Sequence, residues 1–194
     1  MVIGKRVQLR AIEYDDLPLL VKWRNDPEIY QYFYEQEPLS LAMQRAWFER
    51  LLQRPDERLW MIEARETEQA IGTVGLVHID WRNRKAEWGR FLIYPDQYRH
   101  GGYGSEVESL VLRYVFDHMN MNRLQCEVFA ENESVIALHK KFGFQQEGLF
   151  RQYVFKDGHY RSVAYLALLR QDYLSAEVQA RIARYLDLDS TCDG

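Results

Sequence analysis

Three glycines stand close together in the middle of the chain, Gly101, Gly102 and Gly104, between an apolar strand-like run and a helical pattern. A loop in this position presents several backbone N–H groups at the positive end of a helix dipole, where a pyrophosphate can bind. Glycine removes the Cβ atoms that would block close approach, and Arg99 adds a charged donor. The sequence therefore predicts an anion site at this loop, with a glycine-rich turn that binds nothing as the alternative.

Two titratable residues could exchange protons with a ligand. Glu87 lies in a strand-like run, and flanking aromatic residues would raise its pKa toward a value useful for a base. The alternative for Glu87 is a surface ion pair with Arg84 or Lys85. His139 changes charge near neutral pH but shares an apolar helical face with Phe142, so a hydrogen-bonded core histidine is the alternative there.

Alternating patterns predict the strands that would position these residues. Three runs joined by short polar turns indicate an antiparallel meander, and a later run follows the helix after the glycine loop, which implies a parallel step. The Asp157-Gly158 pair predicts a tight hairpin between the last two runs. The predicted strands cover 7–10, 59–64, 70–79, 85–93, 124–129, 149–155 and 160–169.

Helical patterns fill the intervals. A helix is expected to begin near Asp15, and Ser40 can cap the next one, whose apolar face would carry Met43, Trp47 and Leu51. Further helices follow the glycine loop and Asn132. We expect one domain over 1–173, followed by a surface helix and an acidic tail over 174–194.

Composition excludes several classes of protein. The 194 residues carry a net charge of −4 and show no cluster of Lys and Arg, so a nucleic-acid partner is not expected. No apolar run reaches the length of a membrane span and no signal peptide is apparent, which predicts a cytoplasmic protein without a membrane partner. Cys126 is expected in the core, and neither cysteines nor histidines show the spacing of a metal site.

Two segments together resemble a known family. Arg99-x-x-Gly102-x-Gly104 is similar to the acyl-CoA signature of GNAT N-acetyltransferases, and 132–144 resembles their second coenzyme-binding segment, an Asn-led helix that ends in Gly-Phe. The order of elements agrees over 7–169, in the manner of the RimJ/RimL-like branch. The resemblance implies an α+β fold with a mostly antiparallel sheet of six to seven strands, splayed between the fourth (85–93) and the fifth (124–129), with helices on both faces.

The resemblance also implies acetyl-CoA as co-substrate and direct transfer of its acetyl group to an amine. Glu87 would be the general base, and His139 stands where many members have the Tyr that protonates the departing thiolate. The backbone of Leu92, Ile93 and Tyr94 would pair with the pantetheine arm. The remaining coenzyme contacts would come from Arg99, His100, Gly101, Gly102, Tyr103, Gly104, Ser105, Asn132 and Lys141.

The acceptor is expected to be a primary amine of a small molecule, with an amino-sugar nucleotide as the first choice. Several short segments resemble N-acetyltransferases that modify nucleotide-linked amino sugars on the pseudaminic acid route, with Arg24 or Arg45 suited to the diphosphate. The final hairpin is equally similar to spermidine N-acetyltransferases, while a protein N-terminal acetyltransferase and a non-catalytic acyl-CoA sensor remain alternatives. Apolar surface would allow a homo-oligomer. The predicted acceptor contacts are Trp23, Arg24, Tyr34 and Trp88, with a core position in its helix as the alternative for Trp23.

Overall fold

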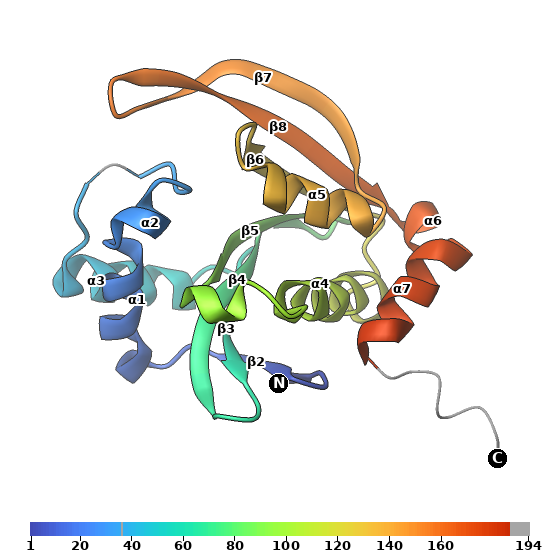
Figure 1. Cartoon of the computed structure of the whole chain (residues 1–194), viewed down its shortest axis with the longest axis horizontal. Coiled ribbons are helices and arrows are strands. Elements are labelled where there is room, and N and C mark those ends of the chain that lie inside the picture. Colours follow the sequence, from blue (N-terminus) through green and yellow to red (C-terminus); the bar gives the residue numbers. More distant parts are fainter. Residues whose placement is uncertain (36, 187–194) are drawn as a thin grey trace.

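A single mixed sheet organises the residues that the computed structural model describes, 1–35 and 37–186. Its eight strands lie in the order β1-β2-β3-β4-β5-β6-β8-β7, and only β5 and β6 run parallel (Figure 1). This confirms the predicted α+β class, with β1 as the strand that the sequence did not predict. The strands are β1 (Val2–Ile3), β2 (Val7–Ala11), β3 (Arg58–Ala64), β4 (Gln69–Asp80), β5 (Lys85–Ile93), β6 (Arg123–Phe129), β7 (Gln145–Lys156) and β8 (His159–Leu169).

Helices cover both faces of the sheet. Adjacent strand residues point to opposite faces, and accordingly Met61 packs in an apolar cluster with α1 to α3, whereas Ile62 packs in a second cluster with α4 and α7. The helices are α1 (Leu17–Arg24), α2 (Pro27–Tyr30), α3 (Leu41–Leu52), α4 (Tyr103–Arg113), α5 (Glu133–Lys141), α6 (Arg170–Tyr173) and α7 (Ala176–Leu186).

The sheet divides between β5 and β6. Their parallel pairing runs from Lys85 opposite Arg123 to Trp88 opposite Cys126 and stops there, although both strands continue. Beyond this point, which we call the fork, the two strands leave a gap between them. The predicted splay is therefore confirmed.

Local signals explain most of these elements. The Ser40 hydroxyl accepts a hydrogen bond from the Met43 N–H at 3.2 Å, as a helix cap should. Asp157 and Gly158 have φ angles of 51° and 79°, which gives the tight hairpin between β7 and β8. The predicted apolar face of α3 is confirmed for Trp47 and Leu51, which pack against the same cluster as the buried Phe48. It is wrong for Met43, which is 45% exposed, while Gln44 is buried.

The C-terminal helix packs on the body of the protein. Val178 and Ile182 of α7 are buried in the same apolar cluster as α4. The acidic tail over 187–194 lies outside the described residues. Within the described part, no helix has the length and apolarity that a membrane crossing requires.

Candidate active site

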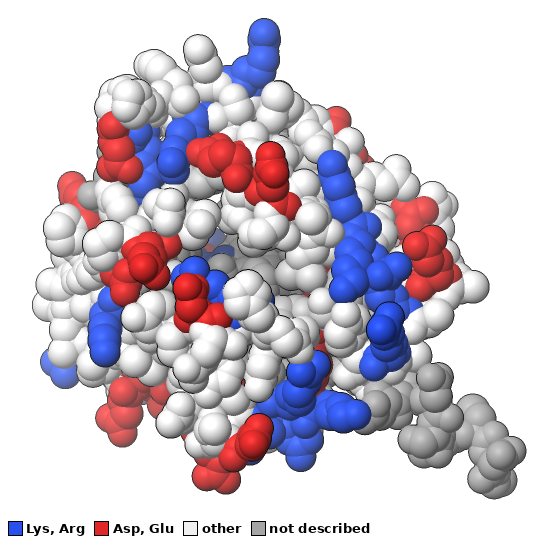
Figure 2. Space-filling model, viewed as in Figure 1, with Lys and Arg blue, Asp and Glu red and all other residues white. Residues whose placement is uncertain are grey.

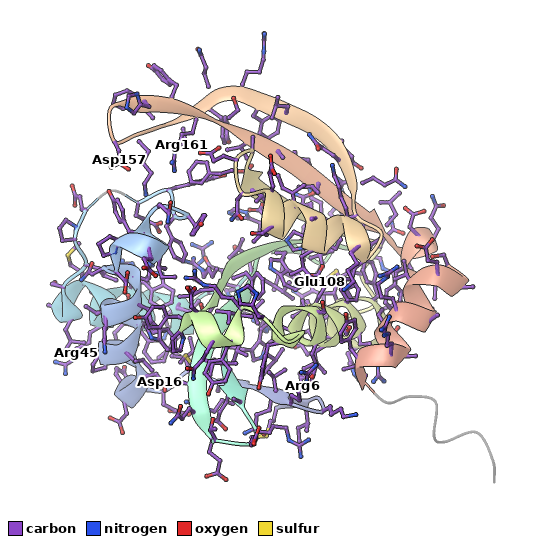
Figure 3. All side chains as sticks on the ribbon, viewed as in Figure 1. Arg6, Asp16, Arg45, Glu108, Asp157 and Arg161 are labelled. Carbon is purple, nitrogen blue, oxygen red and sulfur yellow. The ribbon has the colours of Figure 1, made fainter. Side chains whose placement is uncertain are left out.

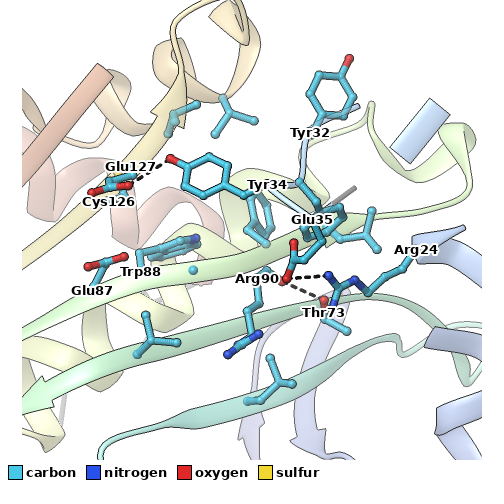
Figure 4. A pocket seen from close by; sticks show the side chains of 18 of the residues that line it. Arg24, Tyr32, Tyr34, Glu35, Thr73, Glu87, Trp88, Arg90, Cys126 and Glu127 are labelled. Carbon is cyan, nitrogen blue, oxygen red and sulfur yellow. Dashed lines mark hydrogen bonds and ion pairs between the residues drawn. The ribbon is translucent and has the colours of Figure 1, made fainter. Parts of the chain in front are cut away.

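A cavity of about 360 Å³ occupies the fork (Figure 4). One side, which we call the α5 wall, is formed by Asn132, Val135 and His139. The opposite side, which we call the loop wall, is formed by Arg24 and by 33–35 in the segment between α2 and α3. The face in Figure 2 shows a central hollow bordered by acidic and basic side chains. A ligand in the fork would therefore be contacted by two different structural units, the α5 wall and the loop wall.

The glycine loop lies where β5 leads into α4. Gly101 and Gly102 have φ angles of 78° and 90°, and Gly102 is the N-cap residue of the 11-residue helix α4. A Cβ atom at Gly102 would lie 3.0 Å from Nη2 of Arg6 and 3.4 Å from the Tyr185 ring. Glycine is therefore needed here for both conformation and space, and the positive end of α4 stays accessible to an anion.

Two arginines hold the loop. Arg6 donates to the Gly101 carbonyl, and its guanidinium lies 5.2 Å from the centre of the Tyr103 ring. Arg99 donates through Nε to the Ile93 carbonyl at 3.2 Å and pairs with Asp96. Arg6 was not predicted from the sequence, because it lies 95 positions before Gly101 and no local pattern connects them. The pairing with Asp96 neutralises part of the positive charge that Arg99 was predicted to offer an anion. The neighbouring His100 is exposed.

A third cation lies at the C-terminal end of α5. Lys141 Nζ donates to Tyr185 Oη at 2.8 Å and lies 3.5 Å from Oγ of the buried Ser105 in the first turn of α4. The hydrogen bonds from Lys141 and Ser105 lower the pKa of Tyr185. Lys141 and Ser105, both predicted coenzyme contacts, are thus brought together with Tyr185 of α7, which sequence analysis missed.

The free edge of β5 differs from the prediction. The Tyr94 N–H donates to the Ile71 carbonyl of β4 at 2.7 Å, and the Leu92 carbonyl also faces β4, since a Cβ atom on Gly72 would lie 2.0 Å from it. Because alternate residues of a strand face the same edge, only Ile93 of the three predicted residues faces the gap, together with Phe91. The assignment of the Leu92 and Tyr94 backbone to a ligand in the gap is therefore wrong.

Asn132 begins α5 at the other side of the gap. Its Oδ1 accepts from the Val135 N–H at 3.4 Å and from the Ser134 hydroxyl at 3.1 Å, so the carbonyl end of the amide caps the helix. The residue also lines the cavity. The Asn132 side chain therefore orients the α5 wall through its amide oxygen, and only its amide NH2 group remains to bind a ligand.

His139 forms a buried pair with Glu108 of α4. Nδ1 lies 2.9 Å from Glu108 Oε1, and the side chains are 1% and 0% exposed. Burial disfavours a charged imidazole, but Glu108 and the neighbouring Cys126 thiol raise the pKa of His139 well above its usual value. Both sequence interpretations of His139 find support, because the ring is buried and hydrogen-bonded yet lines the cavity. Cys126 is in the core, as predicted.

Two carboxylates lie near each other beside the fork. Glu87 Oε2 is 3.1 Å from Nδ1 of His78, not paired with Arg84 or Lys85. Glu127 accepts a hydrogen bond from Tyr34 Oη at 3.0 Å (Figure 4). Burial and the charge of Glu87 raise the pKa of Glu127, and burial together with Glu127 raises that of Tyr34. Glu127 was not predicted from the sequence, because nothing distinguishes it there from an ordinary strand residue.

The loop wall contains an internal ion pair. Arg24 Nη2 lies 2.8 Å from Glu35 Oε1, and its guanidinium lies 4.9 Å from the centre of the Phe33 ring. Trp23 is 2% exposed and packs in the core beside Tyr94, so its assignment to the cavity wall is wrong. Arg45 is exposed on the outer side of α3, away from the fork (Figure 3).

Lys156 fixes the loop wall from a distance. This residue at the end of β7 is fully buried, and Nζ donates to the carbonyls of Tyr30, Phe33 and Glu35 at 2.7, 2.5 and 3.1 Å. It also lies 3.7 Å from the centre of the Tyr30 ring. The β7–β8 hairpin therefore positions the segment that carries Tyr34 and Glu35, a role that the turn-like sequence around Lys156 did not indicate.

No group of three or more His, Cys, Asp or Glu side chains that could hold a metal ion occurs in 1–35 and 37–186. The chemistry available at the fork, as far as the structure describes it, is that of an anion-binding helix end, a buried His–Glu pair and two neighbouring carboxylates.

Comparison with known proteins connects this geometry to a reaction. A family model described as an acetyltransferase (GNAT) domain matches residues 6–145. The uncharacterized N-acetyltransferase YoaA of Bacillus subtilis is 33% identical over 157 residues, which is 79% of this chain and 87% of that protein. The spermidine N(1)-acetyltransferase of Escherichia coli is 28% identical over 169 residues, 87% of this chain and 89% of that protein.

A solved structure agrees with the fold in detail. The spermidine N-acetyltransferase of Vibrio cholerae in complex with CoA and spermine superposes with a TM-score of 0.81 at 26% identity, covering 88% of this chain and 99% of that one.

Proposed function

The chain belongs to the GNAT acetyltransferase family, and from that premise we propose that it transfers the acetyl group of acetyl-CoA to a primary amine of a small cationic molecule, with a polyamine as first candidate. The observation that carries this proposal is the pair of carboxylates, Glu87 and Glu127, beside the fork with Tyr34. Carboxylates and aromatic rings attract an ammonium group.

The residues around the glycine loop fit the coenzyme. The positive end of α4, with Arg6, Arg99 and Lys141 near it, would hold the pyrophosphate. The edge of β5 at Phe91 and Ile93, beyond its pairing with β6, would hold the pantetheine arm beside the Ile93 carbonyl, which accepts from Arg99. When bound, acetyl-CoA supplies an activated acetyl thioester. The chain's own residues must bind it, orient it and move two protons.

Those protons define the roles of Glu87 and His139. The amine must lose a proton before its nitrogen attacks the carbonyl carbon, and Glu87 would accept that proton through a water molecule. As the C–N bond forms and the C–S bond breaks, His139 would donate a proton to the departing thiolate. The raised pKa of His139 keeps the ring protonated to a higher pH than usual, which suits the donor role.

The positions of the arginines support a polyamine better than a nucleotide sugar. Arg24, expected to bind a diphosphate, is paired with Glu35, and Arg45 lies outside the cavity. A diphosphate would have to displace Glu35, whereas an ammonium group meets two carboxylates near the fork. The relatives named as spermidine acetyltransferases point the same way.

The test is CoA release from acetyl-CoA with spermidine, amino-sugar nucleotides and N-terminal peptides as acceptors. We expect turnover with spermidine and a rise in its KM of about 10-fold in Glu127→Gln, since one charged contact is lost. A matched control is Glu66→Gln, in the exposed β3–β4 turn. Turnover only with an amino-sugar nucleotide or a peptide would contradict the acceptor proposal, and coenzyme binding without any turnover would indicate a sensor.

Two expectations from the sequence stay predictions. Light scattering on the purified chain would test for a homo-oligomer, and cell fractionation would test the cytoplasmic location.

A further inference from the structure

Trp88 occupies the point where the sheet divides. It is the last residue of β5 that pairs with β6, opposite Cys126. The residue is only 3% exposed, yet it lines the cavity, and its indole projects into the gap beneath Tyr34 (Figure 4). The ring is therefore part of the surface that a ligand in the fork would meet.

The indole N–H of Trp88 has no hydrogen-bond partner among the described residues. A buried N–H without a partner is unfavourable, and buried tryptophans usually satisfy theirs. The ring is also fixed, because its centre lies 5.3 Å from that of His139 and 5.6 Å from that of Phe91, both in edge-to-face contact. The N–H is thus held in place for a partner that the polypeptide does not supply.

We propose that the Trp88 indole N–H donates a hydrogen bond to the carbonyl oxygen of the acetyl group while that group is transferred. This inference rests on the proposed function. The reaction brings a hydrogen-bond acceptor to the fork in the form of this oxygen, on which negative charge builds up as the amine attacks. The ammonium groups of a polyamine only donate hydrogen bonds, so they cannot satisfy the indole.

The surroundings of Trp88 agree with this role. Glu87, the proposed base, lines the same cavity as Trp88, and His139, the proposed acid, touches the indole ring. Each of the three side chains would then have a separate role: Glu87 accepts the amine proton, His139 protonates the thiolate and Trp88 stabilises the carbonyl oxygen. A fixed donor aimed at developing charge needs no reorganisation during the reaction.

The first test is spectroscopic and needs no turnover. With ¹⁵N-labelled protein, the Trp88 indole resonance is assigned by its loss in Trp88→Phe. We expect acetyl-CoA to move this resonance downfield, as hydrogen bonding does, and CoA, which lacks the acetyl carbonyl, to leave it nearly unchanged. Equal shifts with both ligands, or no shift despite binding, would overturn the inference.

The second test is kinetic. In Trp88→Phe, kcat should fall on the order of 100-fold, the usual effect of removing one such donor, while the Kd of acetyl-CoA stays within about twofold. Trp81→Phe, which alters a 54% exposed tryptophan, is the matched control and should keep wild-type kinetics. A rise in acceptor KM alone would mean that the indole ring contacts the acceptor and would contradict the proposal.

The two proposals fail in different ways. Absence of acetyl-CoA binding or of turnover in the wild-type protein would count against the proposed function. Normal turnover with an unresponsive Trp88 resonance would count against this inference only.

Discussion

The two walls of the fork cavity are built in different ways. The α5 wall and the glycine loop come from one continuous stretch, β5–α4–β6–α5, in which strands and helices flank the loop. The loop wall is an irregular segment after α2, held by the Arg24–Glu35 pair and by Lys156 of a distant hairpin. Under the proposed function, coenzyme binding depends on backbone geometry and acceptor choice on a few side-chain contacts, so the acceptor could change while the fold stays the same.

Among substitutions that affect only one of the two walls, the largest effect is expected at Glu108, which lies behind the α5 wall. Glu108→Leu leaves His139 buried without its partner and should lower the free energy of unfolding by about 3–5 kcal/mol, as broken buried pairs do. Glu108→Gln keeps the shape but removes the charge, and kcat should fall about 10-fold because less of the acid form of His139 is present. Urea unfolding and steady-state kinetics measure both effects. An unchanged kcat in a folded Glu108→Gln protein would mean that His139 is not the acid.

The same pair predicts a pH dependence. Because folding raises the pKa of His139 above its unfolded value of about 6.5, the stabilisation is fully present below that pH and is lost as pH rises through the folded value. The difference in unfolding free energy between wild type and Glu108→Gln should therefore be larger at pH 6 than at high pH. Urea titrations at several pH values check this, and a difference that grows with pH would contradict the assignment.

Gly102→Ala should weaken the binding of acetyl-CoA and not that of the acceptor. The φ angle of 90° and the 3.0 Å approach to Arg6 strain any side chain there, so we expect the Kd of acetyl-CoA to rise about 10-fold. Gly158→Ala is the control, because it has a φ angle of 79° but open space around it. It should cost about 1 kcal/mol of stability without changing coenzyme affinity. Calorimetry measures the Kd of acetyl-CoA for both variants. Equal losses of affinity would contradict the assignment of coenzyme binding to the glycine loop.

This division also explains what the sequence could predict. The glycine loop, the Asp157-Gly158 turn and the Ser40 cap are local patterns, and local patterns were sufficient for them. Arg6, Tyr185 and Glu108 joined the site through tertiary packing, which leaves no periodic signal. Trp23 was misassigned because an aromatic residue on an amphipathic helix looks the same whether it faces the core or a cavity. Leu92 and Tyr94 were misassigned because the strand register with β4 decides which edge is free.

Lys156→Met should weaken the binding of the acceptor and not that of acetyl-CoA. The variant keeps the length and apolar part of the side chain but loses the charged donors to three carbonyls of the loop wall. We expect acceptor KM to rise about 5- to 10-fold with little change in the Kd of acetyl-CoA, since Tyr34 and Glu35 are no longer held in place. Lys140→Met, on the exposed side of α5, is the control. If acetyl-CoA affinity falls as much as acceptor affinity, the hairpin supports both walls.

The smallest effect is expected at Tyr34. Tyr34→Phe removes the hydrogen bond to Glu127 but keeps the ring, whose centre lies 5.1 Å from that of Phe129. Acceptor KM should rise about 3- to 5-fold at pH 8. Burial and Glu87 raise the pKa of Glu127 whereas the Tyr34 hydrogen bond lowers it, so the variant should protonate Glu127 at a higher pH than wild type. The ratio of the two KM values should therefore increase as pH falls toward 6, because a neutral carboxyl no longer attracts the amine. A ratio that stays constant with pH would show that Tyr34 contacts the acceptor directly and does not act through Glu127.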